Sequence, residues 1–109
     1  MSDDNNVIQF SLDGVEQKED KAIEIASRCI RFLNEKSGQN FLARNPKGVP
    51  TASANIIIDR LNEGYTEQQI KQVFARQSRE WRGTEFQRNL TPMTLCRRSN
   101  FEKYLAKCV

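Results

Sequence analysis

Arginine and lysine side chains gather on one side of the segment that follows Thr66. At about 100° per residue, a helical projection separates a polar side from an apolar side. The polar side consists of Lys71, Gln72, Arg76, Arg79 and Arg82. The nearby acid, Glu80, is expected to lie between the two sides rather than among the cations. Like charges along a helix cost a little energy, which an external anion would offset. The pattern therefore predicts a phosphate-binding face, with a merely solvated basic face as the alternative.

Further residues are candidates for the same or a second binding role. Arg88, Arg97 and Arg98 extend the basic face if their segments fold onto the same side. Phe10 and Tyr65 are candidates for contacts with a protein partner. Trp81 could stack on an unpaired base, but it falls on the apolar side of the projection, which favours a packing role.

Residue types argue against an enzyme. The chain has no histidine, the commonest general base and zinc ligand. Cys29, Cys96 and Cys108 lie far apart, without a C-x-x-C pair, and Cys29 fits an apolar helix face. The sequence contains neither of the glycine-rich phosphate-binding motifs G-x-G-x-x-G and G-x-x-x-x-G-K. Asp59 and Glu63 have the spacing of a magnesium pair, but Arg60 beside them favours a surface ion pair. No catalytic residue, metal site or cofactor is predicted.

Charge is distributed unevenly along the 109 residues. Residues 1–20 carry six acidic side chains against Lys18, whereas residues 71–109 carry nine basic side chains against three acidic ones. Residues 1–18 include a short apolar patch of Val7, Ile8, Phe10 and Leu12. The contrast predicts a flexible acidic arm (1–18) attached to a basic domain (19–109).

The spacing of apolar residues predicts helices throughout that domain. The first covers about 19–36 and ends before Gly38. Thr51 caps a second helix that ends at Gly64, and Thr66 with Gln69 forms a capping box for a third. One or two helical turns are expected over 84–90, a short helix from 91 to about 96, and a terminal helix capped by residues 99 and 102. The fold class is all-α, a small single-domain bundle of four to five short helices.

Four motifs in order resemble the conserved phage C-terminal domain of phage and prophage replication (replisome-organiser-like) proteins. Residues 30–41 (IRFLNEKSGQNF) are similar to its opening, and residues 60–66 (RLNEGYT) to its corner. Residues 80–84 (EWRGT) with 90–95 (LTPMTL) resemble its next segment, and residues 100–105 (NFEKYL) resemble its ending. The resemblance covers about 80 residues and implies a phage replication setting.

Two departures from the family pattern bear on function. Members commonly carry this domain behind a winged-helix DNA-binding region, where this sequence has the acidic arm. Residues 96–98 (CRR) replace the usual Phe-Gly-containing stretch. The resemblance then implies a copy that lacks origin recognition and keeps a partner-binding or strand-binding role.

The leading hypothesis is a non-enzymatic phage or prophage accessory replication protein that binds single- or double-stranded DNA, or a replication-fork protein, through its basic helical face. The alternative is a protein–protein adaptor or inhibitor of a host replication protein such as the replicative helicase, without DNA binding. A metal-dependent nuclease is a weaker third hypothesis. No apolar run is long enough to span a membrane and residues 1–20 are too acidic for a signal peptide, so we expect no membrane partner and a cytoplasmic location in the bacterial host.

Overall fold

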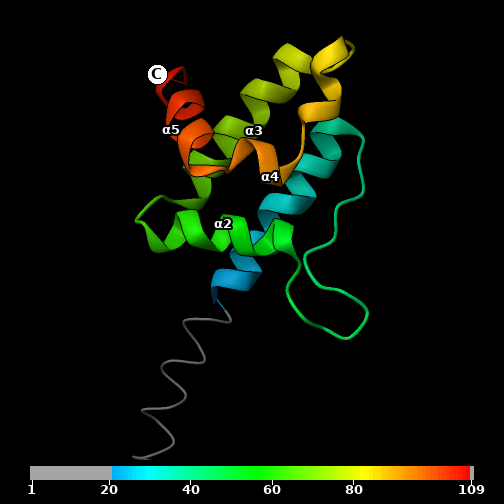
Figure 1. The fold of residues 1–109 in the computed structure, drawn as a ribbon, viewed down its shortest axis with the longest axis vertical. Coiled ribbons are helices and arrows are strands. Elements are labelled where there is room, and N and C mark those ends of the chain that lie inside the picture. The colour runs from blue at the N-terminus through cyan, green and yellow to red at the C-terminus, as the bar shows by residue number, and fades with distance from the viewer. Residues whose placement is uncertain (1–20, 109) are drawn as a thin grey trace, which may run out of the picture.

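The structure is a computed structural model that describes residues 21–108. These residues form an all-α bundle, as predicted (Figure 1). A first helix occupies residues 21–37 of the described chain. It is followed by α2 (Ala52–Asn62), α3 (Glu67–Trp81), a 3₁₀ turn (Glu85–Asn89), α4 (Pro92–Leu95) and α5 (Arg98–Ala106). No helix among the described residues has the length and apolar character that crossing a membrane requires. The predicted arm (1–18), with Phe10, lies outside the described residues.

Helix ends are set by local sequence. Gly38 adopts a φ of +75°, and its N–H donates to the carbonyl oxygen of Asn34 at 2.8 Å, which ends the first helix. Thr51 caps α2, and Thr66 with Gln69 forms the complete capping box of α3. Thr91 caps α4, whose first residue is Pro92. These observations confirm the predicted helix ends. The ends were predictable because each cap depends only on residues within one helical turn of it.

The predicted start of the terminal helix is wrong. Helix α5 begins at Arg98 with Arg97 at the cap position, and no side chain caps it. Ser99 therefore falls inside the first turn, where its hydroxyl cannot cap the helix. Asn100 is turned toward α4 instead, and its amide donates to the carbonyl oxygen of Thr94 at 2.9 Å.

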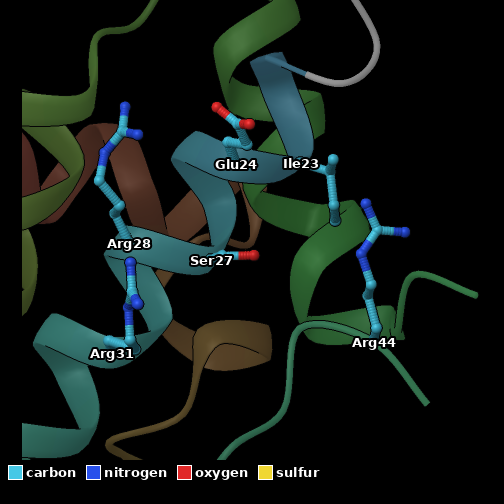
Figure 2. A pocket seen from close by; sticks show the side chains of 6 residues that line it. All are labelled: Ile23, Glu24, Ser27, Arg28, Arg31 and Arg44. Atoms are coloured by element: carbon cyan, nitrogen blue, oxygen red, sulfur yellow. The ribbon is translucent and has the colours of Figure 1, made fainter. Parts of the chain in front are cut away.

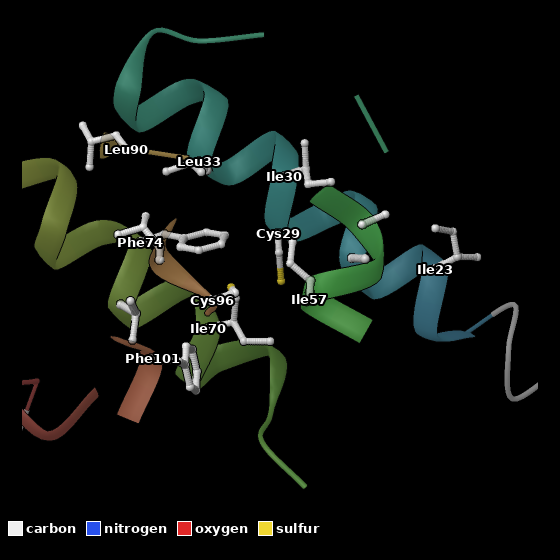
Figure 3. Close-up of a cluster of buried hydrophobic side chains, with 14 residues drawn as sticks. Ile23, Cys29, Ile30, Leu33, Ile57, Ile70, Phe74, Leu90, Cys96 and Phe101 are labelled. Atoms are coloured by element: carbon white, nitrogen blue, oxygen red, sulfur yellow. The ribbon is translucent and has the colours of Figure 1, made fainter. Parts of the chain in front are cut away.

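The core is aliphatic, with two phenylalanines (Figure 3). The first helix contributes one face, and α2 and α3 pack on it together with the short segments after residue 89. The fully enclosed large side chains include Ile30, Leu33, Ile57, Ile70, Phe74, Leu90, Leu95 and Phe101. Each contributes on the order of 1.5–3 kcal/mol by leaving water. Helix α3 also contacts α5, and α2 contacts α4, so the bundle holds α3 between the first helix and α5.

The segment over residues 84–90 forms the 3₁₀ turn, and its two apolar residues, Phe86 and Leu90, differ in burial. Leu90 is fully buried, whereas Phe86 is 49% exposed and leans on Trp81 with ring centroids 6.3 Å apart. Trp81 is half-buried and also meets Tyr104 edge-on at 5.7 Å. Trp81 is thus a rim residue of the core, as its place on the apolar side predicted.

Candidate nucleic-acid interface

Helix α3 carries the predicted basic face, and its solvent side has two flanks. One flank, here called the inner flank, faces the first helix and includes Lys71 and Arg82. The other, here called the outer flank, faces the end of α5 and includes Gln72, Arg76 and Arg79. The two flanks treat their cations differently.

On the inner flank, Glu67 neutralises two cations. Its carboxylate accepts a bidentate pair of hydrogen bonds from Arg28 of the first helix, both at 2.9 Å, and also pairs with Lys71 at 2.9 Å. These hydrogen bonds, from Arg28 first and Lys71 second, lower the pKa of Glu67 to about 2. Lys71 is therefore compensated by an acid within the molecule, contrary to the prediction of an uncompensated face.

Phe32 of the first helix lies beside the same pair. The ammonium groups of Lys36 and Lys71 stand 5.3 and 5.7 Å from the centre of its half-buried ring. At these distances the ring attracts both cations. The inner flank thus holds Lys71 with two intramolecular partners, Glu67 and Phe32.

Arg82 also has an intramolecular role. Its guanidinium donates to the carbonyl oxygen of Lys36 at 2.9 Å, in the last turn of the first helix. Carbonyl groups at the C-terminal end of a helix lack backbone hydrogen-bond donors and carry partial negative charge. An arginine there supplies a donor and a compensating positive charge. Arg82 ties the end of α3 to the end of the first helix.

The outer flank lines a shallow hollow of about 240 Å³. Its walls are Gln72, Ala75, Arg76, Arg79, Lys107 and Cys108. Three of these are cations and none is an acid. Arg76 pairs with Glu80 at 2.8 Å, so Glu80 compensates one cation of the face, contrary to the prediction of an uncompensated face. Arg79 and Lys107 are exposed and have no ion pair within residues 21–108. Sequence analysis missed Lys107 because it lies 28 residues beyond Arg79 and arrives through the packing of α5 on α3.

The remaining predicted cations do not join this hollow. Arg98 is held at the α2–α3 corner, where Glu63 accepts hydrogen bonds from its guanidinium at 2.6 and 3.0 Å. The hydrogen bond and charge of Glu63 raise the pKa of Arg98. Arg88 lies in the 3₁₀ turn and Arg97 before α5; both are exposed and neither lines this hollow.

The same corner explains Glu63, whereas Asp59 is exposed and has no ion pair within residues 21–108. Glu63 also pairs with Arg60 at 3.0 Å, and Arg60 donates to the carbonyl oxygen of Cys96 at 3.1 Å. Arg60 is only 5% exposed, so the expected surface ion pair is half-buried and joins α2 to α4. The residues that the structure describes contain no cluster of three potential metal-binding side chains.

Tyr65 is occupied by packing at this corner. Its ring meets Phe101 edge-on with centroids 4.8 Å apart, and its hydroxyl donates to Glu102 at 3.4 Å. Burial, followed by the charge of Glu102, raises the pKa of Tyr65. A partner-binding role for Tyr65 stays a prediction.

The three thiols differ in environment. Cys29 and Cys96 are fully buried, and loss of water contact raises the pKa of Cys29 to about 12 and that of Cys96 still further. Cys29 is the core residue that its helix face predicted. Cys108 is partly exposed and lines the outer hollow with Arg79 and Lys107.

Comparison with known proteins adds one finding. A family model described as the conserved phage C-terminus matches residues 29–106. No curated protein and no solved structure matches the chain. The matched residues run from the middle of the first helix to the end of α5 and include the whole of α3. With most of its length covered by that model, the chain belongs to the conserved phage C-terminus family.

Proposed function

We propose that this protein is a non-enzymatic phage accessory replication protein that binds nucleic acid through the outer flank of α3. Arg76, Arg79 and Lys107 hold backbone phosphates, and the amide of Gln72 donates a further hydrogen bond. A contact set of this kind reads the charge of the backbone rather than base sequence.

The hollow beside α5 is the observation that carries the proposal. Three cations line it without an acidic neighbour in its walls, and two of them lack any ion pair within the described residues. Uncommitted cations can release the counterions of phosphates without first breaking an internal ion pair. Guanidinium groups add directed donors that match phosphate oxygens.

The charge of the described chain supports the same function. Residues 21–108 carry sixteen lysines and arginines against eight acidic side chains, a balance of +8. Such a field steers a polyanion toward the molecule and raises the association rate. The replication setting is supported by the phage family of the chain and by the resemblance of its four motifs to replication proteins.

Cysteine footprinting combined with a salt titration tests the proposal on the unmodified chain. We expect binding of short single- or double-stranded DNA to weaken with a log–log salt slope of about −2 to −3, because Arg79 and Lys107 contribute fully and Arg76, which is paired with Glu80, contributes in part. Bound DNA should slow alkylation of Cys108 severalfold, while Cys29 and Cys96 stay unreactive with or without DNA because they are buried.

Two results would contradict nucleic-acid binding at this site. The first is binding with no salt dependence, or no binding of either form of DNA. The second is DNA binding that leaves Cys108 as reactive as before. Absence of DNA binding would favour the alternative function, an adaptor that acts on a replication protein, which pull-down from a bacterial lysate would then examine.

A further inference from the structure

The loop between the first helix and α2 displays apolar side chains on a fixed backbone. Leu42 and Val49 are 63% and 54% exposed, more than any other large apolar residue of the described chain. Both lie in residues 39–50, here called the display loop (Figure 1). Exposed apolar groups in a loop cost free energy unless something covers them.

Hydrogen bonds fix the shape of the display loop. Asn34 of the first helix exchanges two bonds with the backbone of Phe41, at 2.8 and 3.0 Å. The side-chain oxygen of Asn45 accepts from two loop N–H groups, and Arg44 donates to the carbonyl of Gly48 at 2.8 Å. Leu42 and Val49 are therefore held in place before anything binds, which reduces the entropy lost on binding.

The display loop returns to the beginning of the first helix. Arg44 of the loop and five residues of the helix line one hollow of about 230 Å³: Ile23, Glu24, Ser27, Arg28 and Arg31 (Figure 2). In that view Arg31 and Arg44 stand on opposite sides of Ser27. The hollow thus lies within about three helical turns of residue 21, where residues 1–20 join the described chain.

Charge on the two segments is complementary. Residues 36–58 contain Lys36, Arg44 and Lys47 and no acidic side chain. Neither Arg31 nor Arg44 has an ion pair within the described residues. Residues 1–20 carry six acidic side chains against one lysine, interspersed with an apolar patch at residues 7–12.

We propose that residues 7–16 bind the display loop of the same chain. Ile8, Phe10 and Leu12 cover Leu42 and Val49, and the carboxylates of Asp13 and Glu16 meet Arg31 and Arg44. Residues 13–20 can span about 26 Å when extended, which reaches the loop from residue 21. Attachment through so short a connection gives an effective concentration of order millimolar, so weak contacts suffice.

This proposal is separate from nucleic-acid binding. Its residues lie on the first helix and the display loop, whereas the proposed phosphate contacts lie on the outer flank of α3 and on Lys107. Either proposal can fail without affecting the other.

Backbone NMR on the full chain tests it. We expect order parameters of residues 7–12 near 0.8, and a fall below about 0.6 in Leu42→Ser. Phe10→Ser should shift the amide resonances of Asn45, Gly48 and Val49. Phe86→Ser is the matched control, because it removes an exposed apolar side chain of the 3₁₀ turn rather than of the loop and should leave residues 7–12 unchanged. Each variant changes an exposed residue or one outside the described chain, so the fold is retained.

Three results would overturn the proposal. Residues 7–12 could already have order parameters below about 0.6 in the parent chain. Phe10→Ser could shift amides of the outer flank instead of those of the loop. Order that disappears on about tenfold dilution would place the segment on a second copy rather than on its own chain.

Discussion

The two flanks of α3 carry the same residue types, but only the outer flank keeps a cation without an ion pair among the described residues. On the inner flank, Lys71 pairs with Glu67, and Arg82 donates to the carbonyl of Lys36. On the outer flank, Arg79 and Lys107 share a hollow without any acid in its walls. Helix α3 thus uses Lys71 and Arg82 to hold the bundle together and leaves Arg79 accessible beside Lys107, which follows α5.

Basic residues can be ranked for phosphate binding by whether they already have a partner within the molecule. A cation that already has an internal partner must leave that partner or share it, and the gain from an external phosphate shrinks accordingly. A cation without such a partner gives the full contribution of counterion release.

Reversing the charge of the outer flank should have the greatest effect on DNA binding. Arg79→Glu combined with Lys107→Glu should weaken binding on the order of 100-fold and reduce the salt slope by about 2, because two phosphate contacts are lost. Arg88→Glu combined with Arg97→Glu is the control, since it changes net charge by the same amount and both residues are exposed and lie outside the hollow. Fluorescence anisotropy measures the DNA affinity of the parent chain, the outer-flank variant and the control variant. An equal loss of affinity in the control would mean that only net charge matters.

Removing the inner-flank arginine should change stability more than binding. Arg82→Ala leaves the Lys36 carbonyl without its donor and should lower the free energy of unfolding by about 1–2 kcal/mol. Urea unfolding followed by circular dichroism measures the change. Arg79→Ala should leave stability within about 0.5 kcal/mol of the parent chain. A stability loss in Arg79→Ala as large as that in Arg82→Ala would contradict the division between flanks.

The pKa of Glu67 makes the inner-flank ion pairs depend on pH. Its folded-state value of about 2 lies below the ordinary 4.5, so its contribution to stability is complete above pH 4.5 and lost as pH falls toward 2. Glu67→Gln should cost about 1 kcal/mol at neutral pH and progressively less below pH 4.5. Glu35→Gln, which removes an exposed carboxylate without an ion pair among the described residues, should show no such pH dependence. Urea unfolding at several pH values measures the free energy of unfolding of both variants and of the parent chain.

The smallest effect is expected for Lys71. Lys71→Gln should weaken DNA binding less than about 2-fold, because Glu67 already neutralises this ammonium group. Arg79→Gln should weaken binding several times more in the same anisotropy assay. Equal losses of affinity in the two variants would show that the ion pair with Glu67 does not reduce the contribution of Lys71 to DNA binding.

Some ion pairs of α3 were within reach of sequence reasoning. Glu67 with Lys71 and Arg76 with Glu80 are both four residues apart, the spacing at which helical side chains meet. The projection placed Glu80 between the two sides and did not consider Glu67, although the long side chains of both acids reach a cation one helical turn away. The role of Arg82 was not predictable in this way, because its partner carbonyl lies 46 residues earlier.

Sequence alone determined the helices, most of their caps and the apolar faces that form the core, because these depend on neighbours within one or two turns. It also determined the basic character of the chain after residue 20. Tertiary packing decided which cations remain accessible: it brought Arg28 to Glu67, Arg98 to Glu63 and Lys107 to Arg79. A charged side chain acts through its nearest partners in space, and residues distant in sequence become partners only when the helices pack.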